Sequence, residues 1–128
     1  MDRRRQISVI LFFLYLAAVG YICFSSGDNF PSFDDSIFGV ATDKVVHFTM
    51  FLPFVFLFYI ACRPGNAGRP LAFWTVSIVA GFLLATVTES VQMLLPSRTA
   101  ELFDCVADGL GVMGGAAFTL LLIINKKI

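Results

Sequence analysis

The hydrophobic positions of this 128-residue chain gather in four long runs that are separated by polar stretches. A helix that crosses the hydrocarbon core of a membrane needs about 20 apolar residues, with a range of about 17–25. Runs of this kind cover about residues 7–24, 45–62, 71–95 and 105–124. The pattern predicts an all-α integral membrane protein, a single domain over residues 1–128 with four transmembrane helices in a compact bundle.

The first run also has one feature of a secretory signal peptide, because three arginines at positions 3–5 precede it. The apolar part of a signal peptide is about 7–15 residues long and ends at a cleavage site with small residues. The first run is longer than this and has no such site. We therefore expect the first helix to remain in the protein.

Basic residues are distributed unevenly between the two ends of the predicted bundle. Only Lys44 and Arg98 lie at one end, whereas the other end carries Arg3, Arg4, Arg5, Arg63, Arg69, Lys126 and Lys127. Cytoplasmic loops of membrane proteins carry an excess of lysine and arginine. We therefore expect both termini in the cytoplasm and the end near Lys44 and Arg98 on the outer face of the membrane.

Composition agrees with a chain that is solvated by lipid. Hydrophobic residues make up 58% and charged residues 14% of the sequence, whereas soluble domains have about 45–50% and about 25%. This excludes a soluble enzyme and a disordered tail. The net charge is zero, so no basic surface indicates a nucleic-acid partner. The three cysteines are widely spaced and show no metal-binding pattern.

Polar residues concentrate at the predicted outer end of the bundle. Ionisable groups at membrane depth are costly and mark functional sites by default. We predict a site at this outer end that binds a ligand through Asp43, Lys44, His47, Glu89, Gln92, Arg98, Asp104 and Asp108. The alternative is structural, since carboxylates at helix starts stabilise the helix dipole and polar side chains also lie among lipid headgroups.

The charges of this set do not balance. Four carboxyl groups near the helix ends face two permanent cations. Either one carboxyl group is protonated, or a divalent metal binds, or the carboxyl groups do not all converge. No cofactor is predicted beyond that metal. The candidates for catalysis are His47, Glu89 and Asp104, because a histidine beside a carboxylate can act as a general base.

Small residues predict where two of the helices approach each other closely. Gly111 and Gly115 are four residues apart in the fourth run, and the third run carries Gly81 and Ala85. Small residues at this spacing let helix backbones come close in membranes. We expect the third and fourth helices to cross here, although a second copy of the chain is an alternative partner. In the second run, Pro53 predicts a kink.

Two segments resemble the VanZ-like family of small bacterial membrane proteins. They are DKVVHFTMF at 43–51 and TESVQMLLPSRTAELFDCVADGLGVMGG at 88–115. The resemblance covers the second to fourth helices, in order and spacing. It implies a multi-helix protein of the bacterial cytoplasmic membrane, and the family's namesake is linked to low-level resistance to teicoplanin. Asparagine is expected at position 108 in many relatives, so Asp108 adds a negative charge here.

Three functions are compatible with these features. The first is an envelope protein whose outer site binds a lipid headgroup, a lipid-linked wall precursor or a lipoglycopeptide, with Lys44 and Arg98 on phosphate or carboxylate groups. The second is a membrane hydrolase or transferase at the same site, with His47 as the base. The third is a structural protein that binds a partner through Gly111 and Gly115.

Overall fold

A computed structural model describes residues 2–24, 36–37, 40–62, 71–95 and 102–127 of the chain. Its elements in chain order are α1 (Arg3–Phe24), β1 (Ser36–Ile37), β2 (Val40–Ala41), α2 (Thr42–Phe51), α3 (Phe54–Cys62), α4 (Leu71–Gln92) and α5 (Leu102–Ile124). The short antiparallel hairpin of β1 and β2 directly precedes α2 and was not predicted. The rest of the loop between the first two spans lies outside the described residues.

Within the residues that the structure describes, four helical segments are long and apolar enough to cross a membrane, in agreement with the predicted number of spans. They are Arg3–Phe24, Asp43–Cys62, Leu71–Gln92 and Leu102–Ile124. Each boundary lies within about four residues of the prediction. The third span ends at Gln92, earlier than the predicted residue 95. Large apolar side chains such as Phe13, Leu83 and Leu121 point outward, as expected for helices surrounded by lipid.

The second span is broken at the predicted position, because α2 ends at Phe51 and α3 begins at Phe54. Pro53 has no N–H group and cannot donate to the carbonyl group of Thr49, one turn earlier. Next to the break, the hydroxyl group of Tyr15 on α1 donates to the carbonyl oxygen of Met50 at 2.7 Å. The break is therefore supported by a hydrogen bond from the first helix.

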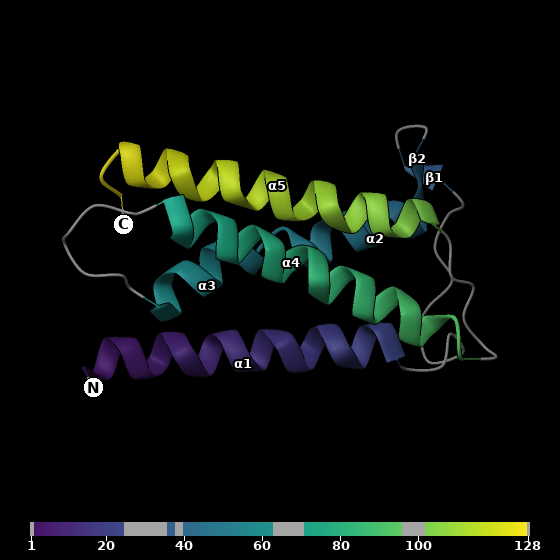
Figure 1. The fold of residues 1–128 in the computed structure, drawn as a ribbon, viewed down its shortest axis with the longest axis horizontal. Coiled ribbons are helices and arrows are strands. Elements are labelled where there is room, and N and C mark those ends of the chain that lie inside the picture. Colours follow the sequence, from purple (N-terminus) through teal and green to yellow (C-terminus); the bar gives the residue numbers. More distant parts are fainter. Residues whose placement is uncertain (1, 25–35, 38–39, 63–70, 96–101, 128) are drawn as a thin grey trace.

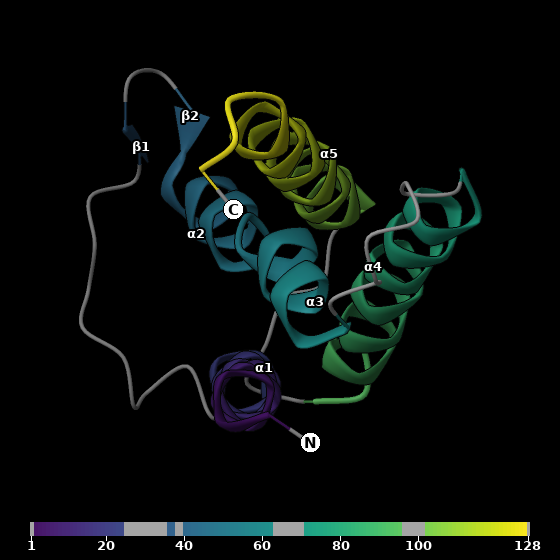
Figure 2. The same ribbon diagram turned by 90° about the vertical axis from the view of Figure 1, so that its left-hand side faces the viewer.

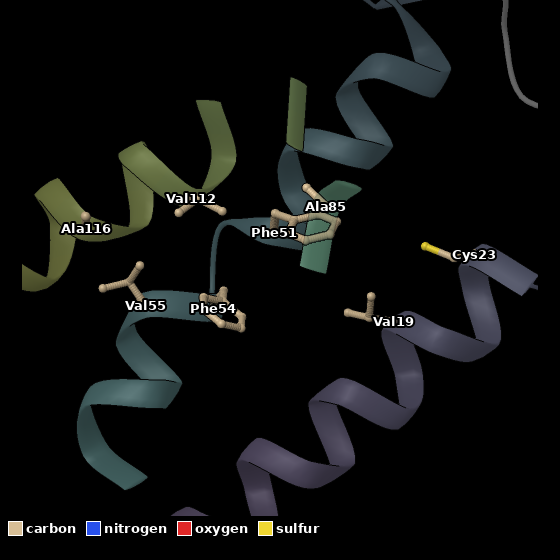
Figure 3. Close-up of a cluster of buried hydrophobic side chains, with 8 residues drawn as sticks. All are labelled: Val19, Cys23, Phe51, Phe54, Val55, Ala85, Val112 and Ala116. Atoms are coloured by element: carbon tan, nitrogen blue, oxygen red, sulfur yellow. The ribbon is translucent and has the colours of Figure 1, made fainter. Parts of the chain in front are cut away.

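The broken span forms the centre of the bundle. Viewed end-on, α3 lies between α1 and α5, with α4 to one side (Figure 2), and the span of α2 and α3 contacts each of the other three helices. Buried apolar side chains from all four spans meet around the break (Figure 3): Val19, Cys23, Phe51, Phe54, Val55, Ala85, Val112 and Ala116. The second span therefore fixes the positions of its neighbours.

The glycines of α5 contact a different helix from the one we expected. A Cβ atom on Gly111 would collide with the carbonyl oxygen of Phe48, and one on Gly115 with that of Leu52. Both carbonyl groups belong to the second span, at and just before its break. Without side chains, these two glycines let α5 lie directly on this backbone, so the sequence pattern identified the close approach but not the partner.

The third and fourth spans also pack together, as expected. Their contact is made by a side chain against a glycine, since a Cβ atom on Gly81 would lie 2.8 Å from Cγ1 of Val112. Gly109 of α5 faces the ring of Phe82 on α4 in the same way. Ala85 lies in the buried core. Gly81 and Ala85 thus serve the packing of α4, but not against Gly111 and Gly115.

Candidate functional site

One end of the bundle gathers polar side chains from three spans. At this end lie the start of α2, the last turns of α4 and the start of α5, while both chain termini lie at the opposite end (Figure 1). We call the following five residues the polar cluster: Lys44, His47, Glu89, Asp104 and Asp108. The structure thus brings together residues that are as much as 64 positions apart in the sequence, counting from Lys44 to Asp108.

Lys44 links a buried carboxylate to an exposed one. Its Nζ atom lies 2.6 Å from Oδ1 of Asp104 and 2.8 Å from Oδ2 of Asp43. The side chain of Asp104 is only 3% exposed, whereas that of Asp43 is 54% exposed. Asp43 therefore lies at the rim of the site. The ammonium group of Lys44 is compensated within the protein, which reduces its capacity to bind an external phosphate.

The imidazole ring of His47 lies between the two aspartates of α5. Its Nδ1 atom is 2.8 Å from Oδ1 of Asp108, and its Nε2 atom is 3.8 Å from Oδ2 of Asp104. Asp104 and Asp108 are four residues apart and share one face of α5, where two carboxylates repel each other. The ring of His47 lies between them, and the ammonium group of Lys44 compensates Asp104.

Glu89 completes the cluster from the side of α4. It is 3% exposed, and it lies close enough to His47 and Asp104 that one ligand atom from each of the three residues falls within 4.8 Å of the others. Within the part of the chain that the structure describes, this is the one group of three such residues that could hold a metal ion. Two carboxylates and one imidazole form a ligand set suited to a divalent cation.

Asp108 is the most deeply buried member of the cluster, with no exposed surface. One of its oxygens contacts His47, but the other, Oδ2, has no hydrogen-bond partner among the described residues. A buried polar atom without a partner costs free energy. The cluster therefore retains capacity to accept a hydrogen bond or to compensate a positive charge.

Gln92, another residue of the predicted site, has surroundings different from those of the polar cluster. Gln92 is buried, but its Nε2 atom donates to the carbonyl oxygen of Cys23 at 3.0 Å. It thereby joins the end of α4 to the end of α1. Arg98 falls outside the described residues, so its distance from the cluster is not assigned.

Sequence analysis did not identify the contribution of α1. The hydroxyl group of Tyr15 donates to the backbone carbonyl group of Met50, about one helical turn after His47 in the chain. The backbone carbonyl group of Cys23 accepts from the side-chain amide of Gln92. The sequence did contain one indication of the role of Tyr15. Its hydroxyl group lies in an apolar helix, and such a group needs a hydrogen-bond partner in lipid. Finding that partner required the arrangement of α1 beside the break.

A protein-family model matches most of this chain. The family described as VanZ/LLP1 matches residues 11–124, which include all five residues of the polar cluster. No curated protein and no solved structure matches the chain. The matched range covers nearly all of the four spans.

Proposed function

This chain belongs to the VanZ/LLP1 family, and from that premise we propose that it is a multi-pass protein of the bacterial cytoplasmic membrane whose polar cluster binds the polar part of an envelope molecule. The candidate ligands are a phospholipid headgroup, a lipid-linked wall precursor and a lipoglycopeptide such as teicoplanin. The unequal distribution of basic residues supports an outward-facing cluster, with both termini in the cytoplasm.

One observation carries this proposal: three spans bury ionisable side chains against one another at the same end of the bundle. Asp104 and Asp108 are 2% and 0% exposed, and Glu89 is 3% exposed. Burial of charged groups at membrane depth is costly, and such groups are typically retained for function. A role in folding alone would be met at lower cost by apolar side chains.

The charges of the cluster favour a particular ligand chemistry. Three buried carboxyl groups face one lysine and one histidine, and the lysine is already paired. The cluster therefore accepts hydrogen bonds more readily than it donates them. Hydroxyl, amide and ammonium groups of a headgroup, a wall precursor or a glycopeptide match this preference. Lys44, which is already paired with Asp104, contributes little to binding a phosphate group.

A second candidate function is a membrane hydrolase or transferase. It is favoured by the contact of 2.8 Å between Nδ1 of His47 and Oδ1 of Asp108, because a carboxylate that orients a histidine is a common feature of general-base catalysis. Purified protein that turns over an envelope lipid, and loses turnover in His47→Gln, is the result expected for this function. Absence of turnover across a panel of envelope lipids contradicts it.

The packing of α5 argues against the third function, a partner protein held by the glycine stripe. Gly111 and Gly115 are buried and lie against the backbone of Phe48 and Leu52 in the same chain. A second protein therefore does not have access to them while the bundle is assembled. The described fold supports an internal role for these glycines.

The proposed function is tested by teicoplanin susceptibility in a sensitised bacterial host. We expect cells that produce the wild-type protein to tolerate more teicoplanin than cells without it. Glu89→Gln, which keeps the size of the side chain and removes its charge, should abolish this protection. Wild type and variant are compared at equal abundance in the membrane.

Ser90→Ala provides the matched control on the same helix, because the side chain of Ser90 is exposed and bonds only to the backbone of Thr86 among the contacts described. It should protect as well as the wild type. If Glu89→Gln protects the cells as well as the wild type does, the polar cluster is not required for teicoplanin tolerance. If the wild-type protein gives no protection, this chain does not confer teicoplanin resistance.

A further inference from the structure

The polar cluster contains three potential metal ligands that come from three different spans. His47 lies on α2, Glu89 on α4 and Asp104 on α5, and one ligand atom from each lies within 4.8 Å of the other two. All three side chains are buried. Because each span supplies one ligand, their positions depend on the packing of the whole bundle.

The orientation of the imidazole ring suits metal binding. With its proton on Nδ1, neutral His47 donates a hydrogen bond to the carboxylate oxygen Oδ1 of Asp108 at 2.8 Å and presents the lone pair of Nε2. That atom lies 3.8 Å from Oδ2 of Asp104, which is too far for a hydrogen bond. Histidines that bind metals are commonly held by such a carboxylate on their other nitrogen.

The spacing of these atoms matches two ligands of one small cation. Bonds from Zn²⁺ to histidine nitrogen and carboxylate oxygen are about 2.0–2.2 Å, so two tetrahedral ligands lie about 3.4 Å apart. The separation of 3.8 Å between Nε2 of His47 and Oδ2 of Asp104 closes to this value with a small side-chain movement. A carboxylate oxygen of Glu89 lies within 4.8 Å of a ligand atom of each of the other two residues.

The surroundings of Asp108 give a second reason to expect a cation at this site. Asp108 is fully buried, and its Oδ2 atom has no hydrogen-bond partner among the residues that the structure describes. It lies one helical turn from Asp104 and directly against His47. A divalent cation on Nε2 of His47 would compensate the excess negative charge of the three carboxylates at this point.

We propose that His47, Glu89 and Asp104 bind a divalent transition metal of the Zn²⁺ type, with Asp108 as the residue that positions His47. Three protein ligands leave a fourth position for water or for an oxygen of an envelope molecule. An imidazole ligand favours Zn²⁺ over Mg²⁺ and Ca²⁺, which prefer oxygen ligands. Metal binding stands independently of the proposed function, because it requires no headgroup.

The test is a titration of Zn²⁺ into the full-length protein, purified in detergent and freed of metal with a chelator. Calorimetry should show one Zn²⁺ per chain, and the metal should raise the temperature of thermal unfolding. Mg²⁺ and Ca²⁺ should have little effect. Co²⁺ bound in place of Zn²⁺ should give visible absorption bands, which report the ligands directly.

Variants separate ligands from the positioning residue. His47→Gln, Glu89→Gln and Asp104→Asn should each weaken Zn²⁺ binding by about 100-fold or more, and Asp108→Asn by about 10- to 100-fold with the Co²⁺ bands retained. Asp2→Asn removes a carboxylate from the opposite end of the bundle and should bind Zn²⁺ like the wild type.

Two results would overturn the proposal. One is a wild-type chain whose unfolding temperature and calorimetric signal do not respond to Zn²⁺, a measurement that does not depend on any variant folding. The other is His47→Gln with wild-type affinity. Because the titration contains no envelope ligand, its failure leaves the teicoplanin experiment unaffected, and failure of that experiment leaves the metal site in place.

Discussion

At the scale of the residue, Lys44 forms two ion pairs with described residues, and these pairs differ in how far they are removed from solvent. The partner side chain is 3% exposed in one pair, with Asp104, and 54% exposed in the other, with Asp43. Loss of one member of a buried ion pair leaves an uncompensated charge, whereas an exposed charge is stabilised by water. The two pairs should therefore contribute very differently to stability.

Lys44→Met tests this difference in protein that is free of metal. We expect it to lower the free energy of unfolding by about 3–5 kcal/mol, because Asp104 stays buried without its cation. Asp43→Asn removes the exposed pair and should cost less than about 1 kcal/mol. Unfolding of both variants in mixed detergent micelles measures these values. Equal losses would show that Asp104 does not depend on Lys44.

The sequence allowed the place of these residues at one end of the bundle to be predicted, but not their pairing. Lys44 lies next to Asp43 in the chain and 60 positions before Asp104. Its main partner depends on the rotation of α5 about its own axis, which is set by packing rather than by the spacing of polar residues. The same rotation decides that Asp108, and not Asp104, contacts Nδ1 of His47.

At the scale of the element, the contact between α5 and the second span depends on the absence of two side chains. Gly111 and Gly115 lie against carbonyl oxygens of Phe48 and Leu52. The break at Pro53 was predictable, since proline interrupts helical hydrogen bonding wherever the helix lies. The helix that packs against the two glycines was not predictable. The spacing of small residues indicates that another helix approaches closely, but it does not identify that helix.

Gly115→Ala should therefore be costly, although alanine is a better helix former than glycine. Its Cβ atom would collide with backbone that cannot move aside, and we expect a loss of about 3 kcal/mol in the free energy of unfolding. The control is Gly20→Ala in α1, where an added Cβ atom meets only the ring of Phe24 at 3.9 Å.

Gly20→Ala should be neutral or stabilise the protein by about 0.5–1 kcal/mol, because glycine is unfavourable within a helix. Both substitutions add the same methyl group, so their difference isolates the contact of α5 with the second span. If the two variants unfold alike, α5 has room to move away from Leu52, and the glycine is not required for the close approach.

At the scale of the whole molecule, the bundle has two chemically different ends. Both termini lie at one end and the polar cluster at the other (Figure 1). An even number of spans places both termini on the same side of a membrane. The distribution of basic residues predicts that this side is the cytoplasm.

Reporter fusions at the C-terminus test this orientation. A green fluorescent protein fused after residue 128 should fluoresce, and alkaline phosphatase at the same position should be inactive, because it requires the oxidising compartment outside. A fusion of phosphatase within residues 25–35 should be active. Active phosphatase at the C-terminus would place the polar cluster in the cytoplasm and exclude direct contact with ligands outside the cell.

The hydrogen bonds of α1 also have a bearing on how the protein is made. Tyr15 bonds to a carbonyl group 35 residues further along the chain, and Cys23 accepts from an amide 69 residues further along. Both partners leave the ribosome after α1, so neither is available when α1 enters the membrane. The bond of Tyr15 can form only once the second span has joined α1, and that of Cys23 only once the third span has joined it. The first helix to enter the bilayer is therefore fixed in two steps, and the second step waits for the third span.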